Sequence, residues 1–284
     1  MSTLITGASG HLGRLVVASL LERGVPAADI VAGARDTSSI ADLAALGVVT
    51  RHLDYDAPES IATALEGVDR LLLVSASTPG IRTAQHQNVI DAAKAAGIQY
   101  LVYTSAPKAT TSALILAPEH KATEEAIAAS GIPAVILRNG WYTENYVGQI
   151  AQATATGELV ASVGEGRVSS ASRKDFAEAA AVVLTEPGHL GNVYELSGDV
   201  AWDYTELAAA ISTVTGTDVT YRPVTPDEHA ALLTAAGLDA GTVGFVVALD
   251  GNTRDGLLGE TSGDLGRLIG RPTMPLVEGL RAAL

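Results

Sequence analysis

The stretch Leu4-Ile5-Thr6-Gly7-Ala8-Ser9-Gly10-His11-Leu12-Gly13 gives the clearest indication of how this chain folds. It joins a short apolar strand to a glycine-rich turn, and an amphipathic helical pattern follows over residues 15–21. A dinucleotide pyrophosphate needs this order, because the turn brings backbone N–H groups at a helix N-terminus up to the phosphates. Gly7 is predicted to form the turn, Gly10 to admit the phosphates, and Gly13 to let the helix pack close to the strand. The residues predicted to bind the cofactor here are Gly7, Ser9, Gly10, His11, Leu12 and Gly13.

Further short apolar runs recur along the first half of the chain, separated by helical patterns that end in glycine. Strands are predicted at 29–34, 48–53, 70–74, 101–104 and 134–137, and helices at 38–46, 59–65, 84–96 and 119–129. Continuous apolar runs of this length are typical of strands that are buried on both faces. The alternation predicts an α/β fold: a Rossmann-like doubly wound parallel sheet with helices on both faces and a smaller C-terminal substrate lobe.

After residue 140 the alternation becomes less regular. Helices are predicted at 143–156 and 174–185, a late strand at 193–196, and a helix at 207–214 that opens on the capping box Asp203-Tyr204-Thr205-Glu206. The tail from about residue 224 to 284 is predicted to be mostly helical. We therefore expect a nucleotide-binding Rossmann body over 1–140, and a mixed region over 141–284 that completes the body and forms the substrate lobe.

The composition fits a metabolic enzyme and argues against several other classes. The 284 residues are 47% hydrophobic and 4% aromatic, contain no cysteine, and carry a formal net charge of −14. The charge disfavours a nucleic-acid partner, and the lack of cysteine excludes disulfides and thiolate chemistry. No apolar run reaches the roughly 20 residues that span a bilayer. We expect a cytoplasmic protein with no membrane partner and no metal site.

The end of the second predicted strand indicates which dinucleotide binds. At this point an acidic side chain holds the ribose 2′-hydroxyl of NAD, whereas arginine accommodates the 2′-phosphate of NADP. Arg35 stands there, which favours NADP(H), although Asp36 follows it directly. The alternative is that Arg35 is a solvated turn residue, or stacks on adenine without discriminating between the two cofactors. Asp54 is predicted to accept from the adenine amino group, with turn capping as its alternative role.

Small residues end the next two predicted strands. These are Ser75, Ala76 and Ser77 after the fourth strand, and Thr104 and Ser105 after the fifth. Ligands of open α/β sheets bind at the carboxyl ends of the strands, so these residues are predicted to leave room for the ribose and nicotinamide.

The catalytic motif of short-chain dehydrogenases, a tyrosine four residues before a lysine, is absent. At its usual place the chain has Ala117-Pro118-Glu119-His120-Lys121, with alanine in the tyrosine position. His120 is the replacement candidate, since a reference pKa of about 6.5 suits proton transfer near neutrality; its alternative role is to cap the helix or bond a neighbour. Lys121 could contact a nicotinamide ribose, or pair in solvent with Glu124 or Glu125.

The segment 137–146 is aromatic in a chain that has few aromatic residues. Trp141, Tyr142 and Tyr146 are predicted to form a flat wall for an aromatic substrate, and Asn139 and Asn145 to donate hydrogen bonds to it. The alternative is that these rings pack the lobe against the body.

Taken together, these segments resemble the bacterial NAD(P)H:quinone oxidoreductases of the NmrA-like, atypical short-chain dehydrogenase/reductase family. The residues that carry the resemblance are the glycine turn at 7–13, Ala93-Lys94-Ala95-Ala96-Gly97, Tyr103-Thr104-Ser105, Glu119-His120 with Thr123-Glu124, 137–146, 194–199 and 268–273. The segment 137–146 is especially typical of that subgroup, and the resemblance extends over essentially the whole chain.

The resemblance implies NADPH as cofactor and hydride transfer to a quinone or similar conjugated acceptor. A quinone accepts hydride to give a delocalised, weakly basic anion, which is consistent with the missing tyrosine acid. Two alternatives remain: a non-catalytic NADP-binding redox sensor, and a reductase of carbonyls, imines or dyes. The oligomeric state stays open, with a homodimer as one option.

Overall fold

The computed structural model describes residues 1–78 and 80–284, and the chain divides into two compact units. Unit 1 comprises Met1–Thr110, Leu116–Asn139 and Arg173–Glu195. Unit 2 comprises Thr111–Ile115, Gly140–Ser172 and Leu196–Leu284. The second half of the chain therefore contributes 173–195 to unit 1.

Unit 1 is built on a seven-stranded sheet. Its strands are β1 (Thr3–Ile5), β2 (Ile30–Ala34), β3 (Val49–His52), β4 (Arg70–Leu73), β5 (Tyr100–Ser105), β6 (Ala134–Asn139) and β8 (Val193–Leu196). Their order is β3-β2-β1-β4-β5-β6-β8, and the neighbours from β3 to β6 pair in parallel. The order reverses between β1 and β4, which is where doubly wound sheets bind ligands. The predicted fold class is confirmed, and the predicted strands differ from these bounds only at their ends.

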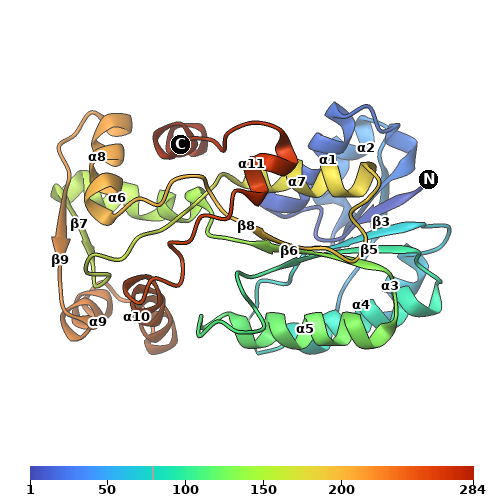
Figure 1. The fold of residues 1–284 in the computed structure, drawn as a ribbon, viewed down its shortest axis with the longest axis horizontal. Helices are drawn as coiled ribbons and strands as arrows, with labels where there is room; N and C mark the ends of the chain where they lie inside the picture. Colours follow the sequence, from blue (N-terminus) through green and yellow to red (C-terminus); the bar gives the residue numbers. More distant parts are fainter. Residues whose placement is uncertain (79) are drawn as a thin grey trace. The chain divides into compact units, whose positions relative to one another are not determined.

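Helices cover both faces of this sheet. They are α1 (His11–Glu22), α2 (Ala41–Ala45), α3 (Pro58–Ala64), α4 (Arg82–Ala95), α5 (Ala117–Ser130) and α7 (Arg173–Thr185), with 3-10 turns at Ala27–Asp29 and Thr37–Ile40. Figure 1 shows α3, α4 and α5 on one face and α1, α2 and α7 on the other. The helix predicted at 38–46 is thus a 3-10 turn followed by the short α2.

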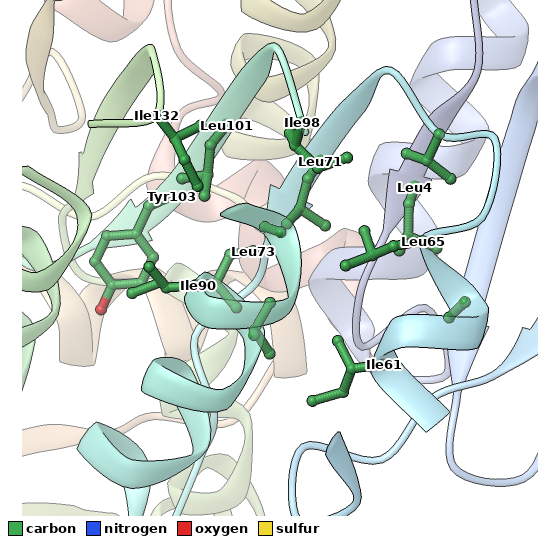
Figure 2. Packing of buried hydrophobic residues seen from close by; sticks show 14 of the residues in the cluster. Leu4, Ile61, Leu65, Leu71, Leu73, Ile90, Ile98, Leu101, Tyr103 and Ile132 are labelled. Atoms are coloured by element: carbon green, nitrogen blue, oxygen red, sulfur yellow. The ribbon is translucent and has the colours of Figure 1, made fainter. Parts of the chain in front are cut away.

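The core between the sheet and the α3–α5 layer consists of aliphatic side chains and one tyrosine. Leu4, Leu71, Leu73 and Leu101 project from successive strands, and Ile61 of α3 packs against the same cluster (Figure 2). Each of these side chains is fully buried, and burying a leucine or isoleucine contributes roughly 1.5–3 kcal/mol. This packing holds the strand ends that form the site.

Unit 2 is mainly helical. Its helices are a 3-10 turn at Thr143–Tyr146, α6 (Val147–Thr156), α8 (Tyr204–Thr215), α9 (Pro226–Ala235), α10 (Ala240–Arg254), α11 (Asp264–Ile269) and α12 (Leu276–Ala283). The predicted capping box is confirmed, because Asp203 accepts from the N–H of Glu206 and Glu206 reaches back to the N–H of Asp203. Unit 2 also contains a parallel strand pair that the sequence patterns do not indicate, β7 (Glu158–Ala161) with β9 (Thr220–Pro223). In the part of the chain that the structure describes, no helix has the length and apolar character needed to cross a membrane.

Candidate active site

Unit 1 contains a cavity of about 400 Å³ at the carboxyl ends of β1, β2, β3 and β4. Eleven of the thirteen predicted cofactor residues line it: Gly7, Ser9, Gly10, His11, Leu12, Gly13, Arg35, Asp54, Ser75, Ala76 and Ser77. The other lining residues are Ala34, Leu53, Tyr55, Val74, Thr78, Gln85 and Arg173. The cavity thus lies at the reversal of strand order, where the fold places nucleotides.

The glycine turn has the geometry that the sequence predicts for it. Gly7 has a φ of +59°, a conformation that side chains with a Cβ rarely adopt. A Cβ on Gly13 would lie 2.4 Å from the carbonyl oxygen of Gly7, so the helix approaches the turn too closely for any larger residue. Gly10 is the N-cap of α1 and makes no side-chain cap bond. The turn therefore exposes a helix N-terminus to the cavity, which suits an anionic group such as a pyrophosphate.

Arg35 and Asp36, adjacent in sequence, have different environments. Arg35 is exposed at the cavity, and its guanidinium has no partner within residues 1–78 and 80–284. The carboxylate of Asp36 accepts hydrogen bonds from the N–H and the hydroxyl of Ser38, at 2.9 and 2.7 Å, and these bonds lower the pKa of Asp36. Asp36 is thus engaged in capping the 3-10 turn, whereas Arg35 is available to a phosphate.

Asp54 lines the cavity and also caps a turn. Its side chain accepts a hydrogen bond from the N–H of Asp56 at 3.1 Å. Asp54 therefore caps the turn, as in its alternative role, and lines the cavity as well. Tyr55, which sequence analysis passed over, donates its hydroxyl to the carbonyl of Val74 at 2.7 Å. Burial raises the pKa of Tyr55, so the phenol stays protonated and braces the end of β4.

Side chains of α4 fix the loop after β4. The N–H of Ala76 donates to Nε2 of His86 at 2.9 Å, and Arg82 donates to the carbonyl of Ala76 at 2.7 Å. His86 therefore carries its proton on Nδ1, which lies 2.9 Å from the hydroxyl of Thr123 in α5. Burial, with a smaller effect of the Arg82 charge, lowers the pKa of His86 to about 3 and keeps it neutral.

Thr104 and Ser105 do not line the cavity. The Thr104 hydroxyl accepts a hydrogen bond from the N–H of Ser75 at 2.9 Å, so Thr104 helps to fix the backbone of a residue that lines the cavity. Ser105 donates to Glu124 at 2.6 Å. A direct contact of either side chain with the cofactor stays a prediction.

The two candidate catalytic residues of α5 differ in burial. His120 is 5% exposed, and its Nδ1 lies 2.8 Å from the hydroxyl of Tyr103. Burial, and then the charge of Arg82, lower the pKa of His120 to about 3, so the ring is neutral at pH 7. Lys121 is exposed and lies 3.9 Å from Glu125, as in its solvated alternative. Neither residue lines the cavity described above.

Of the predicted acceptor residues, Asn139 belongs to unit 1, whereas Trp141 and Tyr142 belong to unit 2. Asn139 is buried at the end of β6 in unit 1. In unit 2, Tyr142 forms a parallel bridge with Ala171, and Trp141 makes a side-chain hydrogen bond to the buried Tyr146. Contact of these residues with an acceptor stays a prediction.

Besides Tyr55, three polar residues that the sequence patterns do not indicate line the cavity: Thr78, Gln85 and Arg173. Arg173 begins α7, far along the chain from the other lining groups, and Gln85 lies in the second turn of α4. No local pattern indicates either position, because only the folded sheet brings α7 to the first four strands. Among the described side chains, no group of three or more His, Cys, Asp or Glu is placed to hold a metal ion.

The comparison with known proteins agrees with this geometry. A family model described as NAD(P)H-binding matches residues 7–187, more than half of the chain. Quinone oxidoreductase 2 of Escherichia coli (strain K12) is 45% identical over 274 residues, 96% of each chain. The crystal structure of an NADPH-dependent quinone oxidoreductase from Escherichia coli, complexed with NADPH, matches with a TM-score of 0.94 and 44% identity over 99% of each chain.

A dye reductase is also similar over its full length. The triphenylmethane reductase of Citrobacter sp., complexed with NADP(H), matches with a TM-score of 0.94 and 38% identity over 100% of both chains. These findings confirm the family and the NAD(P)H cofactor class that the sequence predicts. The chain belongs to the NAD(P)H-binding oxidoreductase family that includes quinone oxidoreductase 2.

Proposed function

We propose that this protein is an NADPH-dependent reductase of quinones and similar conjugated acceptors. The observation that carries the proposal is the 45% identity to a quinone oxidoreductase over 96% of both chains. When bound, NADPH supplies the hydride. Two features of the cavity support this cofactor. Its glycine turn has no room for larger side chains, and two arginines, Arg35 and Arg173, line the cavity.

The residues of α5 support a reaction without an obligatory side-chain acid. Alanine occupies the usual tyrosine position at 117, and the neutral His120 has no imidazolium proton to give at pH 7. A reduced quinone needs little acid help, because its negative charge is delocalised over the ring and both oxygens. Asn139, Trp141 and Tyr142 are proposed to hold a flat acceptor.

The direct test compares NADPH oxidation by the purified protein with and without 1,4-benzoquinone. We expect rapid oxidation only when the quinone is present, and a triphenylmethane dye serves as the second acceptor because of the 38% identity to a dye reductase. Tight NADPH binding without turnover of either acceptor would contradict the enzyme and favour a redox sensor.

Arg35→Ala should raise the Michaelis constant for NADPH by about 10- to 100-fold and leave that for NADH nearly unchanged, since a charge-assisted phosphate contact contributes about 1.5–3 kcal/mol. Only NADPH carries the 2′-phosphate that this guanidinium would meet. Steady-state kinetics with both cofactors measure the effect, and Arg14→Ala, which removes a neighbouring arginine paired with Asp42, is the control. Equal losses with the two cofactors would assign Arg35 to another role.

His120→Ala should lower the quinone rate by about tenfold or less, because the proposed reaction does not need a side-chain acid. Loss of a true general acid would instead lower the rate by about 100-fold or more. Trp141→Ala should instead raise the Michaelis constant for the quinone and leave NADPH affinity unchanged. Steady-state rates and NADPH titrations separate the two effects. A 100-fold loss in His120→Ala with a proton-linked rate profile would make His120 the acid and favour ketones or imines as substrates.

We further propose that the protein is cytoplasmic, since a chain without cysteine cannot form the disulfides that stabilise many proteins of oxidising compartments. Cell fractionation tests the location. Light scattering of the purified protein tests whether it forms a homodimer.

A further inference from the structure

An ion-pair network joins the carboxyl ends of β5, β6 and β8 in unit 1. The guanidinium of Arg138 in β6 donates to both carboxylate oxygens of Glu124 in α5, at 2.9 and 2.6 Å. Its third donor reaches Oε1 of Glu195 in β8 at 2.7 Å. The side chains of Arg138 and Glu124 are only 12% and 9% exposed, so water screens this pair weakly, whereas the Glu195 side chain is 31% exposed. Hydrogen bonding to Glu124 raises the pKa of Arg138, which therefore remains charged.

The second oxygen of Glu195 holds the loop that follows β5. Oε2 accepts the backbone N–H of Lys108 at 3.0 Å. Lys108 has a φ of +46° and is, among the described residues, the one non-glycine residue with a positive φ. A side chain with a Cβ is strained in this region, and such strain persists only where neighbouring groups impose it. The hydrogen bond from Lys108 to Glu195 is one contact that helps to hold this conformation.

The network lies at the edge of the sheet where ligands bind. Ser105, at the end of β5, donates to Glu124, and the preceding Thr104 supports the cavity residue Ser75. Arg138 directly precedes Asn139, the first of the proposed acceptor residues. The chain passes between the two units directly after Thr110, Asn139 and Glu195, and Thr110 also accepts from Arg138 at 3.2 Å. The network therefore anchors the backbone from which the acceptor-binding segment departs.

We propose that Glu195 is a positioning residue for the acceptor: it holds the loop 106–110 in a strained conformation and fixes the end of β6. Glu195 acts through Lys108 and Arg138 and touches no reacting atom. This inference rests on the proposed reductase activity. Two acceptor oxygens on one side chain are required, because one serves the guanidinium and the other the loop N–H. Glu195→Gln offers one such oxygen and should have a partial effect.

The first experiment measures kinetics and amide hydrogen exchange of the full chain with Glu195→Ala. Release of the loop should raise the Michaelis constant for 1,4-benzoquinone by about tenfold. Once relaxed, the loop must regain its strained conformation when the quinone binds, and the free energy of that strain corresponds to about this factor. The turnover number at saturating quinone and the affinity for NADPH should change by less than about twofold. Exchange should rise at residues 106–110. Glu22→Ala, an exposed carboxylate at the far end of α1, is the charge-matched control.

A rescue experiment tests the strain itself. Glycine adopts a positive φ without cost, so Lys108→Gly in the Glu195→Ala background should recover most of the lost quinone affinity. Lys108→Ala in the same background removes the same charge but keeps the Cβ, and should recover none of it. In the parent protein, Lys108→Gly should have little effect.

Equal recovery by Lys108→Gly and Lys108→Ala would overturn the strain argument. An unchanged Michaelis constant in Glu195→Ala, with or without faster exchange, would reduce the network to a structural brace and overturn the positioning role. Failure of the proposed function is distinguishable, because it shows in the parent protein as no turnover of benzoquinone. If the parent reduces only a triphenylmethane dye, the same variants are compared with the parent by their Michaelis constants for that dye.

Discussion

Gly10→Val should lower the affinity for NADPH by at least about 100-fold while the apo protein stays folded. Gly10 lines the cavity at the N-terminus of α1, and a Cβ there would meet one protein atom, the carbonyl oxygen of Gly7, at 3.2 Å. A few tenths of an ångström of movement relieve that contact. The two valine methyl groups, however, would occupy the space at the helix N-terminus that the pyrophosphate needs. Titration calorimetry with NADPH, together with the melting temperature of the apo protein, measures both effects.

Gly13→Ala is the matched comparison, because its steric conflict lies within the protein. The added Cβ would lie 2.4 Å from the carbonyl oxygen and 2.8 Å from the carbonyl carbon of Gly7. Backbone atoms cannot yield by that amount, so this variant should melt at a lower temperature even without cofactor. Gly148→Ala, in a helix and with no atom within 4 Å of the added Cβ, should be neutral. Parent-like NADPH binding by Gly10→Val would place the phosphate site elsewhere.

The free energy of unfolding should fall by about 4–5 kcal/mol between pH 6.5 and pH 4.5 through His86 and His120 alone. Burial lowers both pKa values to about 3 in the folded protein, whereas each unfolded ring titrates near the reference pKa of about 6.5. Between these values the unfolded chain binds more protons than the folded one. Stability is therefore fully present above pH 6.5 and is lost as the pH falls towards 3.

Denaturant unfolding of the parent and of His120→Gln at several pH values tests this linkage. Glutamine still offers an oxygen to the Tyr103 hydroxyl and does not titrate, so the variant should lose about half of this pH dependence below pH 6.5. Between pH 7 and 8 neither ring changes charge, and the stability difference between parent and variant should be constant there. An identical slope for both proteins at acid pH would show that His120 takes up its proton in the folded state.

The nucleotide half of the site could be predicted because its signals are local. Gly7, Gly10 and Gly13 act within one turn, and Arg35 and Asp54 follow directly on apolar strands. Parallel strands bring their carboxyl ends to the same edge, so each strand that the sequence reveals also places the residues that follow it. Eleven predicted residues consequently line one cavity.

Other predictions needed neighbours that the sequence does not reveal. Thr104 and Ser105 have the expected strand position, but neither lines the cavity, because their hydroxyls bond to Ser75 and Glu124. The strands β7 and β9 are four residues each and pair across 62 positions of sequence, so neither carries a periodic pattern long enough to recognise.

The doubly wound sheet, the glycine turn and the absence of the tyrosine acid could all be predicted before folding, because these features depend on residue type and short spacing. Which charges pair and which backbone is strained depend on the three-dimensional fold. Glu195 meets Lys108 across 87 residues, and Arg173 reaches the cavity from a helix that begins after β6. The energy of such contacts depends on distance, burial and direction in space, and these quantities exist only once the chain is folded.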